Sequence, residues 1–175
     1  MKPFLQIHLR WTASIFFLFG SLAMIQGQIH YVNHTAAGSL NGSSWTDAFT
    51  DIQSAIDTAS AGDSIFVAAG IYLPTHTHLG DSGRHNTFYI NKSIQLYGGF
   101  SGKPGTEGGY SEHNVTTHLT ILSGDLGLPT VDSDNAFHVL YFDHVSDTTK
   151  IDGFTIAQGN GIGGVGLEAY GAGIY

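Results

Sequence analysis

The feature that most constrains this fold is a series of short strand-like segments joined by single bends rather than by hairpin turns. Each segment is rich in Ile, Val, Phe and Tyr and is bounded by Gly, Asn, Asp or Ser. The predicted strands are residues 64–73, 87–100, 118–124, 136–142 and 150–159. Bends such as "AAG" and "NKS" suit a chain that coils around an axis, which predicts an all-β architecture.

Two all-β architectures compete, a sandwich or jelly roll made of hairpins and a coil of stacked strands. Asn-Gly or Asp-Gly turns between alternating strands would mark hairpins. Asn41-Gly42 precedes the predicted helix, however, and Asp152-Gly153 lies inside a predicted strand. A loose repeat of the segments favours the coil. The points taken as equivalent in this repeat are Ile65, Ile94, Leu119 and Ile151.

Residues 46–60 are predicted to form an amphipathic helix, with Trp45 packed beneath it. Ser44 or Thr46 is expected to cap its start, and Gly62 to end it in a left-handed turn. One helical face carries Phe49, Ile52, Ile56 and Ala59. Because the open end of a coil of strands exposes an unpaired edge, this helix is expected to cover the first end.

Several longer runs support the coil. They are "NGSSWTDAFTDIQSAIDTASAGDSIFVAAGIYLPT", "IQLYGGFSG", "TILSGD", "DNAFHVL" and "IDGFTIAQGN". With these runs the chain resembles secreted bacterial proteins of the pectin-lyase-like superfamily. The resemblance implies a right-handed parallel β-helix with an N-terminal capping helix. It is specific for architecture and weak for activity, because one fold hosts many functions.

The last residues, "GAGIY", resemble a repeat start in these proteins and in chlamydial polymorphic outer membrane proteins. In such proteins another coil follows this motif. We therefore expect an N-terminal fragment with an incomplete C-terminal end, whose full form carries more coils and an anchoring segment. A short protein with a frayed end is the alternative. In that case we expect a partner or a second copy at the edge of the last coil.

Residues 1–27 read as a signal peptide. Lys2 and Arg10 supply positive charge, residues 12–25 are apolar, and cleavage is expected after Gly27. An uncleaved anchor is the alternative, although a membrane-spanning helix needs about 20 apolar residues. The prediction is a secreted or cell-surface protein.

The mature chain is predicted to have an N-terminal segment with the capping helix, residues 28–62, and a coil domain, residues 63–175. Four basic residues remain beside fourteen acidic ones, which gives a net charge of −10. Such a charge repels nucleic acid and anionic lipid. No later segment is apolar enough to span a membrane, and no cysteine is present to form disulfides.

The resemblance also raises polysaccharide cleavage. Lyases of this superfamily commonly use a basic residue beside calcium, and the mature chain has one arginine, Arg84, which we interpret as a loop charge. Galacturonan hydrolases use aspartates that include an Asp-Asp pair, and this sequence has none. Hydrolysis needs two carboxylates at a set separation. The nearest candidates are Asp125, Asp132, Asp134 and Asp143.

Two groups of side chains have residue types that can bind a metal ion. Asp132 and Asp134 in "DSDN" alternate oxygen ligands as calcium loops do, although the glycine and glutamate of an EF-hand are missing. They are the calcium candidates, with a simple turn as the alternative. His76, His78 and His85 supply three imidazoles, which we interpret as members of a polar insert rather than a metal site.

The glycine-rich insert 97–114 contains Phe100 and Tyr110. Both are candidate glycan contacts, because an aromatic ring on a loop can stack on a sugar ring. The alternative for Phe100 is that it folds back onto the strands. Asn-x-Ser/Thr triplets also occur, which we interpret as chance rather than as glycan acceptors. They begin at Asn33, Asn41, Asn91 and Asn114.

The sequence is compatible with two functions. The first is a non-catalytic extracellular or cell-surface module of the adhesin, passenger or stalk type that contacts polysaccharide or another glycan. The second is a secreted polysaccharide lyase or glycoside hydrolase. Sparse charge within the strands favours the first, since a catalytic face should carry more of it.

Overall fold

The structure is a computed structural model that describes residues 27–78, 83–162, 166 and 171–175. The predicted signal peptide, apart from Gly27, lies outside these residues. The described chain is mainly β, with one short α-helix, α1 (Ile52–Thr58). The strands are β1 (Ile29–Val32), β2 (Ser64–Ala68), β3 (Gly70–Tyr72), β4 (His76–Thr77), β5 (Asn86–Ile90), β6 (Gln95–Phe100), β7 (Thr120–Ser123), β8 (Leu140–Phe142), β9 (Lys150–Asp152) and β10 (Phe154–Ala157).

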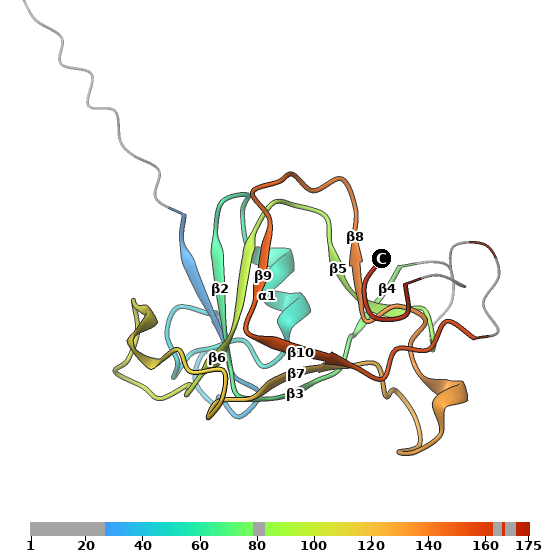
Figure 1. The fold of residues 1–175 in the computed structure, drawn as a ribbon. Helices are drawn as coiled ribbons and strands as arrows, with labels where there is room; N and C mark the ends of the chain where they lie inside the picture. The colour runs from blue at the N-terminus through green and yellow to red at the C-terminus, as the bar shows by residue number, and fades with distance from the viewer. Residues whose placement is uncertain (1–26, 79–82, 163–165, 167–170) are drawn as a thin grey trace, which may run out of the picture.

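The strands form three small sheets whose pairing is parallel except between β4 and β5. The first sheet has the order β1-β2-β6-β9, the second β10-β7-β3 and the third β4-β5-β8. The chain passes through the three sheets in the same order, from β2 to β3 to β5 and again from β6 to β7 to β8 (Figure 1). A third pass runs from β9 to β10 and ends in a parallel bridge between Leu140 and Ile174.

Sharp corners divide three of the predicted strands. The segment 64–73 becomes β2 and β3, 87–100 becomes β5 and β6, and 150–159 becomes β9 and β10. At the last of these corners Gly153 has φ +78°, a left-handed conformation that glycine adopts without steric cost. The predicted bends are therefore confirmed, and each of these three predicted strands is two strands in the structure.

The main core lies between the three sheets and is almost entirely aliphatic. In the first sheet, parallel register aligns Ile65 with Leu96 and Leu96 with Ile151. The predicted repeat points need correction, because Leu96 rather than Ile94 is the equivalent of Ile65. Leu119 is 56% exposed and is not a core position. The fully or nearly buried members of this core are Val32, Ile52, Ala55, Ile56, Ala59, Ile65, Val67, Tyr72, Phe88, Ile90, Ile94, Leu96, Leu122, Val139 and Leu140.

The helix α1 is shorter than residues 46–60 and begins later. Asp51 is its N-cap and accepts a hydrogen bond from the backbone N–H of Ser54 at 2.8 Å. Phe49 cannot join the helix, because its backbone pairs with Tyr31 and Asn33 of the β1 segment. The apolar face of α1 nevertheless packs into the main core, in contact with β1, β2 and β5.

A second apolar cluster covers the outer face of the first sheet. Tyr31, Phe66 and Tyr97 stand at aligned positions of β1, β2 and β6, and their rings point away from the main core. Trp45 and Phe100 pack over them. Trp45 therefore belongs to this outer cluster and does not lie beneath the helix as predicted.

A buried carboxylate attaches β1 to the rest of the first sheet. Asp63 accepts hydrogen bonds from the backbone N–H of Gln28 at 2.7 Å and of Ser60 at 2.8 Å, and it contacts His30 Nε2 at 3.2 Å. Burial raises the pKa of Asp63, but these hydrogen bonds outweigh it and leave the pKa below its usual value. The ionised form of Asp63 thus holds Gln28, just before β1, against the segment that leads into β2.

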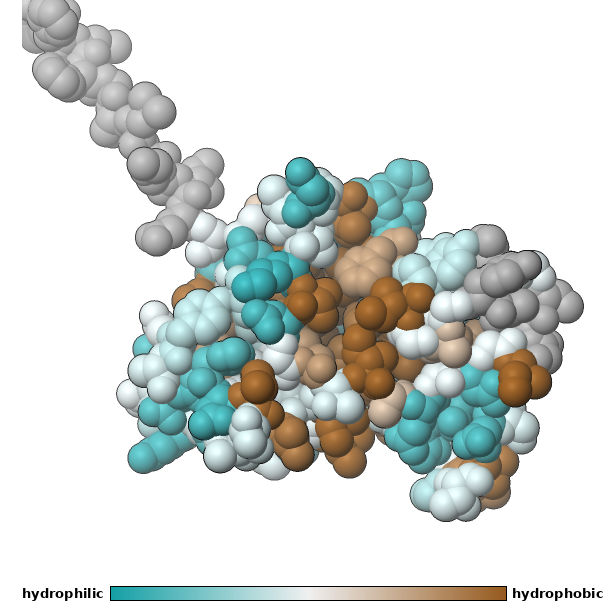
Figure 2. Space-filling model, in the orientation of Figure 1, coloured by the Kyte–Doolittle hydropathy of each residue, from teal (hydrophilic) through white to brown (hydrophobic). Residues whose placement is uncertain are grey.

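The last two strands along the chain, β9 and β10, carry part of a band of apolar side chains. Figure 2 shows this band over the face where β9 and β10 lie in Figure 1. Its partly buried members are Phe142, Val145, Ile151, Phe154 and Ile156.

Across the part of the chain that the structure describes, helices are too short or too polar to pass through a bilayer.

Candidate functional site

A groove runs over the outer face of the first sheet. Its floor contains Ile29, Ser64 and Gln95, which the parallel register places side by side on β1, β2 and β6. Lys150 on β9 continues this row. The groove has a volume of about 610 Å³. Its remaining walls are Gly27, Gly62, Phe66, Gly108, Gly109 and Tyr110.

Tyr110 forms one wall of this groove and is 51% exposed. The ring is supported from behind by Phe66 at 5.4 Å and Tyr97 at 5.2 Å between ring centroids. Burial, and then a hydrogen bond with Tyr97, raises the pKa of the Tyr110 phenol, so this hydroxyl is neutral at physiological pH. An exposed and supported aromatic ring beside a row of polar side chains can bind a ligand with one apolar face and several hydroxyls.

Phe100, the other predicted glycan contact, is only 1% exposed. Its ring stacks on Phe66 at 4.4 Å and also packs against Trp45. Protein atoms therefore cover both sides of the ring, and the glycan-contact prediction for Phe100 does not hold. The alternative considered above, that this residue folds back onto the strands, describes its position.

A second aromatic surface lies on the outer face of the third sheet. Register aligns Tyr89 on β5 with Tyr141 on β8, and Tyr175 follows the bridge at Ile174. The three phenol rings form a row, with centroids 6.1 Å apart in the first pair and 5.0 Å in the second. We call Tyr89, Tyr141 and Tyr175 the tyrosine row. Each of its rings is partly exposed.

Histidines cover one end of the tyrosine row. His76 and His78 both stack on Tyr89, at 5.0 and 4.5 Å, and His78 also contacts Tyr141 at 4.0 Å. These histidines thus belong to an ordered aromatic surface. Burial lowers the pKa of His78, so its imidazole is neutral at pH 7.

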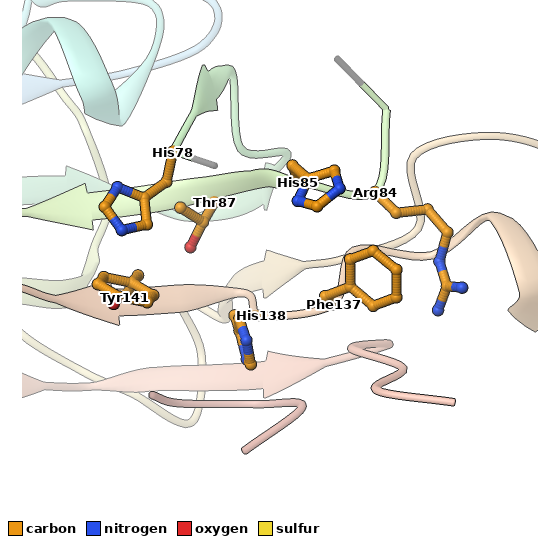
Figure 3. Close-up of a pocket in the computed structure, with 7 residues that line it drawn as sticks. All are labelled: His78, Arg84, His85, Thr87, Phe137, His138 and Tyr141. Atoms are coloured by element: carbon orange, nitrogen blue, oxygen red, sulfur yellow. The ribbon is translucent and has the colours of Figure 1, made fainter. Parts of the chain in front are cut away.

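Beside the tyrosine row lies a small enclosed space, which we call the histidine pocket. Figure 3 shows His78 and Tyr141 at one end and Arg84 and Phe137 at the other, with Thr87 between them. His85 and His138 complete the lining. The pocket has a volume of about 10 Å³, which is room for one small group.

Arg84 holds the pocket together and is not a simple loop charge. Its Nε donates to the carbonyl of Asn135 at 2.7 Å, and its two terminal nitrogens donate to the carbonyls of Ile162 and Asn160. The guanidinium also lies 4.0 Å from the ring centroid of Phe137. Since each of its three nitrogens donates to a backbone carbonyl, Arg84 joins three loops.

The four candidate carboxylates do not come together as one site. Asp143 follows β8 and accepts a hydrogen bond from the hydroxyl of Tyr89. This bond raises the pKa of Tyr89 to about 12 and, acting first among several causes, lowers the pKa of Asp143. Asp125, Asp132 and Asp134 lie in the loop between β7 and β8.

The calcium candidates lie in a short 3₁₀ turn, Asp132–Asp134. One carboxylate oxygen of Asp134 accepts from the backbone N–H of Leu128 at 2.8 Å. Among the described residues no three His, Asp or Glu side chains are arranged to hold a metal ion. Enclosed Oδ1 atoms of Asp125, Asp134 and Asn135 nevertheless find no donor within the part of the chain that the structure describes. The calcium prediction for Asp132 and Asp134 stays a prediction.

Three of the Asn-x-Ser/Thr triplets have a local structural role. The side-chain oxygens of Asn33, Asn41 and Asn114 each accept a hydrogen bond from the backbone N–H two residues later. Such Asx turns favour asparagine followed by small polar residues. The turns supply a physical reason for these triplets that does not involve glycans.

The tyrosine row was missed by the sequence reasoning, although the sequence contains its signal. The triplets "FYI" at 88–90 and "LYF" at 140–142 both place tyrosine between two apolar residues, and "IY" ends the chain. In a strand, alternating side chains face opposite sides. A tyrosine between two core residues must therefore point outward.

Comparisons with protein-family models, with curated proteins and with solved structures find no match.

Proposed function

We propose that this protein is a secreted, non-catalytic glycan-binding module built on a right-handed parallel β-helix. The repeated passage through three sheets supports this architecture, since each pass stacks its strands on those of the previous one. The basic start and apolar run of residues 1–27 support secretion. The binding site is the groove beside Tyr110.

The observation that carries the proposal is the polar row beside an exposed ring. Ser64, Gln95 and Lys150 stand at aligned positions on neighbouring strands, which are about 4.8 Å apart. A glycan that lies across these strands can form hydrogen bonds at each step while one sugar ring stacks on Tyr110. Because the mature chain carries a net charge of −10, a neutral glycan is favoured over a polyanion.

The test is binding of the secreted protein to an array of neutral and acidic glycans, followed by calorimetry on the best ligand. Tyr110→Ala should weaken binding about tenfold or more, because an exposed aromatic contact is removed. Tyr110→Phe is the matched control and should bind nearly as well, since it keeps the ring. Equal affinities for the wild type and Tyr110→Ala would contradict the assignment of this groove.

The same glycans test the enzymatic alternative. The protein is incubated with each bound glycan, with and without calcium, and reducing ends and unsaturated products are measured. The proposal expects no product above the background of a heat-denatured sample. Product formation would contradict the non-catalytic function and favour a polysaccharide lyase or glycoside hydrolase.

A further inference from the structure

Gln28 is held through both of its backbone groups by the residues at the start of β2. Its N–H donates to Asp63 Oδ1 at 2.7 Å, and its carbonyl accepts from the backbone N–H of Ser64 at 2.8 Å. Asp63 is fixed in turn, because its own carbonyl accepts from the N–H of Gln95 on β6 at 2.9 Å. The nitrogen of Gln28 thus has a defined position beside a carboxylate, just before β1 begins.

The carboxylate of Asp63 is buried without a full positive charge beside it. The residue is 8% exposed, so its negative charge needs partners inside the protein. Two partners are the backbone N–H groups of Gln28 and Ser60, and the third is His30 Nε2, which can donate from the neutral ring. The ammonium of Lys92 donates to two carbonyls at the end of α1 and not to this carboxylate. A cation at the nitrogen of Gln28 would therefore complete the surroundings of Asp63.

We propose that Asp63 binds the amino terminus of the processed protein, with the α-ammonium group of Gln28 in an ion pair with its carboxylate. This inference rests on the secretion that forms part of the proposed function, since the amino group exists only after cleavage between Gly27 and Gln28. Cleavage adds a positive charge to the nitrogen, while the carbonyl of Gln28 stays bonded to Ser64. The nitrogen therefore keeps its place, and its hydrogen bond becomes a charge-assisted one.

The residue before Gln28 suits a cleavage position. A Cβ at Gly27 would clash with the carbonyl oxygen of Gly62, so glycine is the residue that this part of the fold accepts. A signal peptide also ends in small residues. One glycine thus meets both requirements, and its removal leaves the new amino group beside Asp63.

The ion pair has a chemical consequence, because an amino-terminal glutamine can cyclise. The neutral amine attacks the side-chain carbonyl carbon of Gln28, an N–Cδ bond forms, and the Cδ–Nε2 bond breaks with release of ammonia. The product is a pyroglutamate. An ammonium ion has no lone pair for this attack. Because Asp63 favours the charged form, it is expected to slow the cyclisation of Gln28 in the folded protein.

The experiment starts with the intact mass of the secreted protein, which identifies its first residue and reveals any loss of ammonia. The rate of ammonia loss is then followed by mass spectrometry in the wild type and in Asp63→Asn. We expect cyclisation to be about tenfold faster in Asp63→Asn, since a fall of about one in the pKa of the amino group gives tenfold more neutral amine. Asp147→Asn, which removes a negative charge from an exposed residue between β8 and β9, should cyclise at the wild-type rate.

A second measurement keeps Asp63 unchanged, in case Asp63→Asn weakens the fold. Gln28→Ser cannot cyclise, and the side chain that it replaces is exposed. The pKa of its amino group is obtained from the pH dependence of carbamylation by cyanate, read on the amino-terminal peptide. We expect this pKa to lie above the ordinary value of about 8 in the folded protein and to return to it in urea.

The outcomes separate this inference from the proposed function. Equal pKa values in the folded and unfolded protein, or equal cyclisation rates in the wild type and Asp63→Asn, would overturn the ion pair. A first residue other than Gln28 would overturn it as well. In each of these cases glycan binding that depends on Tyr110 would still support the proposed function, whereas a chain that keeps residues 1–27 would also count against the proposed secretion.

Discussion

The outer faces of the first and third sheets both carry a row of aromatic residues, but other segments of the chain bury the first row and leave the other partly exposed. In the first sheet, Tyr31, Phe66 and Tyr97 are 3–4% exposed. Trp45 and the insert after β6 cover them. In the third sheet, the tyrosine row stays partly exposed and is flanked by histidines. The same strand geometry thus yields a second core on one side and an open surface on the other.

The difference shows how inserts decide the role of an aromatic row. Parallel register places equivalent residues about 4.8 Å apart, so any outward aromatic position repeats as a row of rings. Where a long insert packs over the row, the buried rings stabilise the folded protein. Where the covering segment is as short as β4, the rings stay partly exposed. Tyr110, at the rim of the covered row, is the ring that stays half exposed among the described residues of this cluster.

The largest expected effect separates the covered row from the open one. Phe66→Ala should reduce the free energy of unfolding by about 3–5 kcal/mol, because a buried ring is replaced by a cavity. Tyr141→Ala should reduce it by only about 1 kcal/mol, since a partly exposed ring loses a few aromatic contacts. Urea unfolding followed by tryptophan fluorescence measures both. Comparable losses for the two variants would mean that the two faces do not differ in the way described.

A smaller effect is expected where Arg84 joins the loops beside the open row. Arg84→Met should reduce the free energy of unfolding by about 2 kcal/mol, because its charged hydrogen bonds to backbone carbonyls are lost. Arg84→Lys should recover little, since an ammonium cannot reproduce the planar guanidinium. The measurement is thermal unfolding by circular dichroism. Lys103→Met is the control, as it removes one positive charge from an exposed residue of the insert between β6 and β7.

The bends between the strands were predictable from the sequence, whereas the contrast between the two aromatic rows was not. Gly153 and the "NKS" bend mark corners because glycine and polar turn residues interrupt strands whatever packs around them. The start of the helix was less predictable. Phe49 has the right spacing for a helical face, but tertiary pairing with Tyr31 outweighs that preference. Local patterns therefore give the bends, and contacts between distant residues set the element boundaries.

The candidate sites depended even more on distant contacts. Nothing near Arg84 in sequence indicates that its partners are the carbonyls of Asn135, Asn160 and Ile162. Phe100 looked available for a sugar because its neighbours are glycines, yet its ring is buried by residues from three other segments. Phe100 ends β6, whereas Tyr110 lies in the insert that follows it, and this difference separates the buried ring from the exposed one.

The smallest expected effect is a change in the pKa of one phenol in the tyrosine row, that of Tyr89. Tyr89 and the buried Tyr72 both have a pKa of about 12, but for different reasons. In Tyr89 the main cause is the hydrogen bond to Asp143, whose negative charge disfavours a phenolate, whereas in Tyr72 it is burial. Asp143→Asn should therefore lower the pKa of Tyr89 towards 10 and leave that of Tyr72 unchanged. Alkaline titration of ultraviolet absorbance, with Tyr89→Phe to assign the signal, measures this shift. If Tyr89 still titrated near 12 in Asp143→Asn, burial would have to explain its pKa, and the third sheet would be more enclosed than the contrast with the first requires.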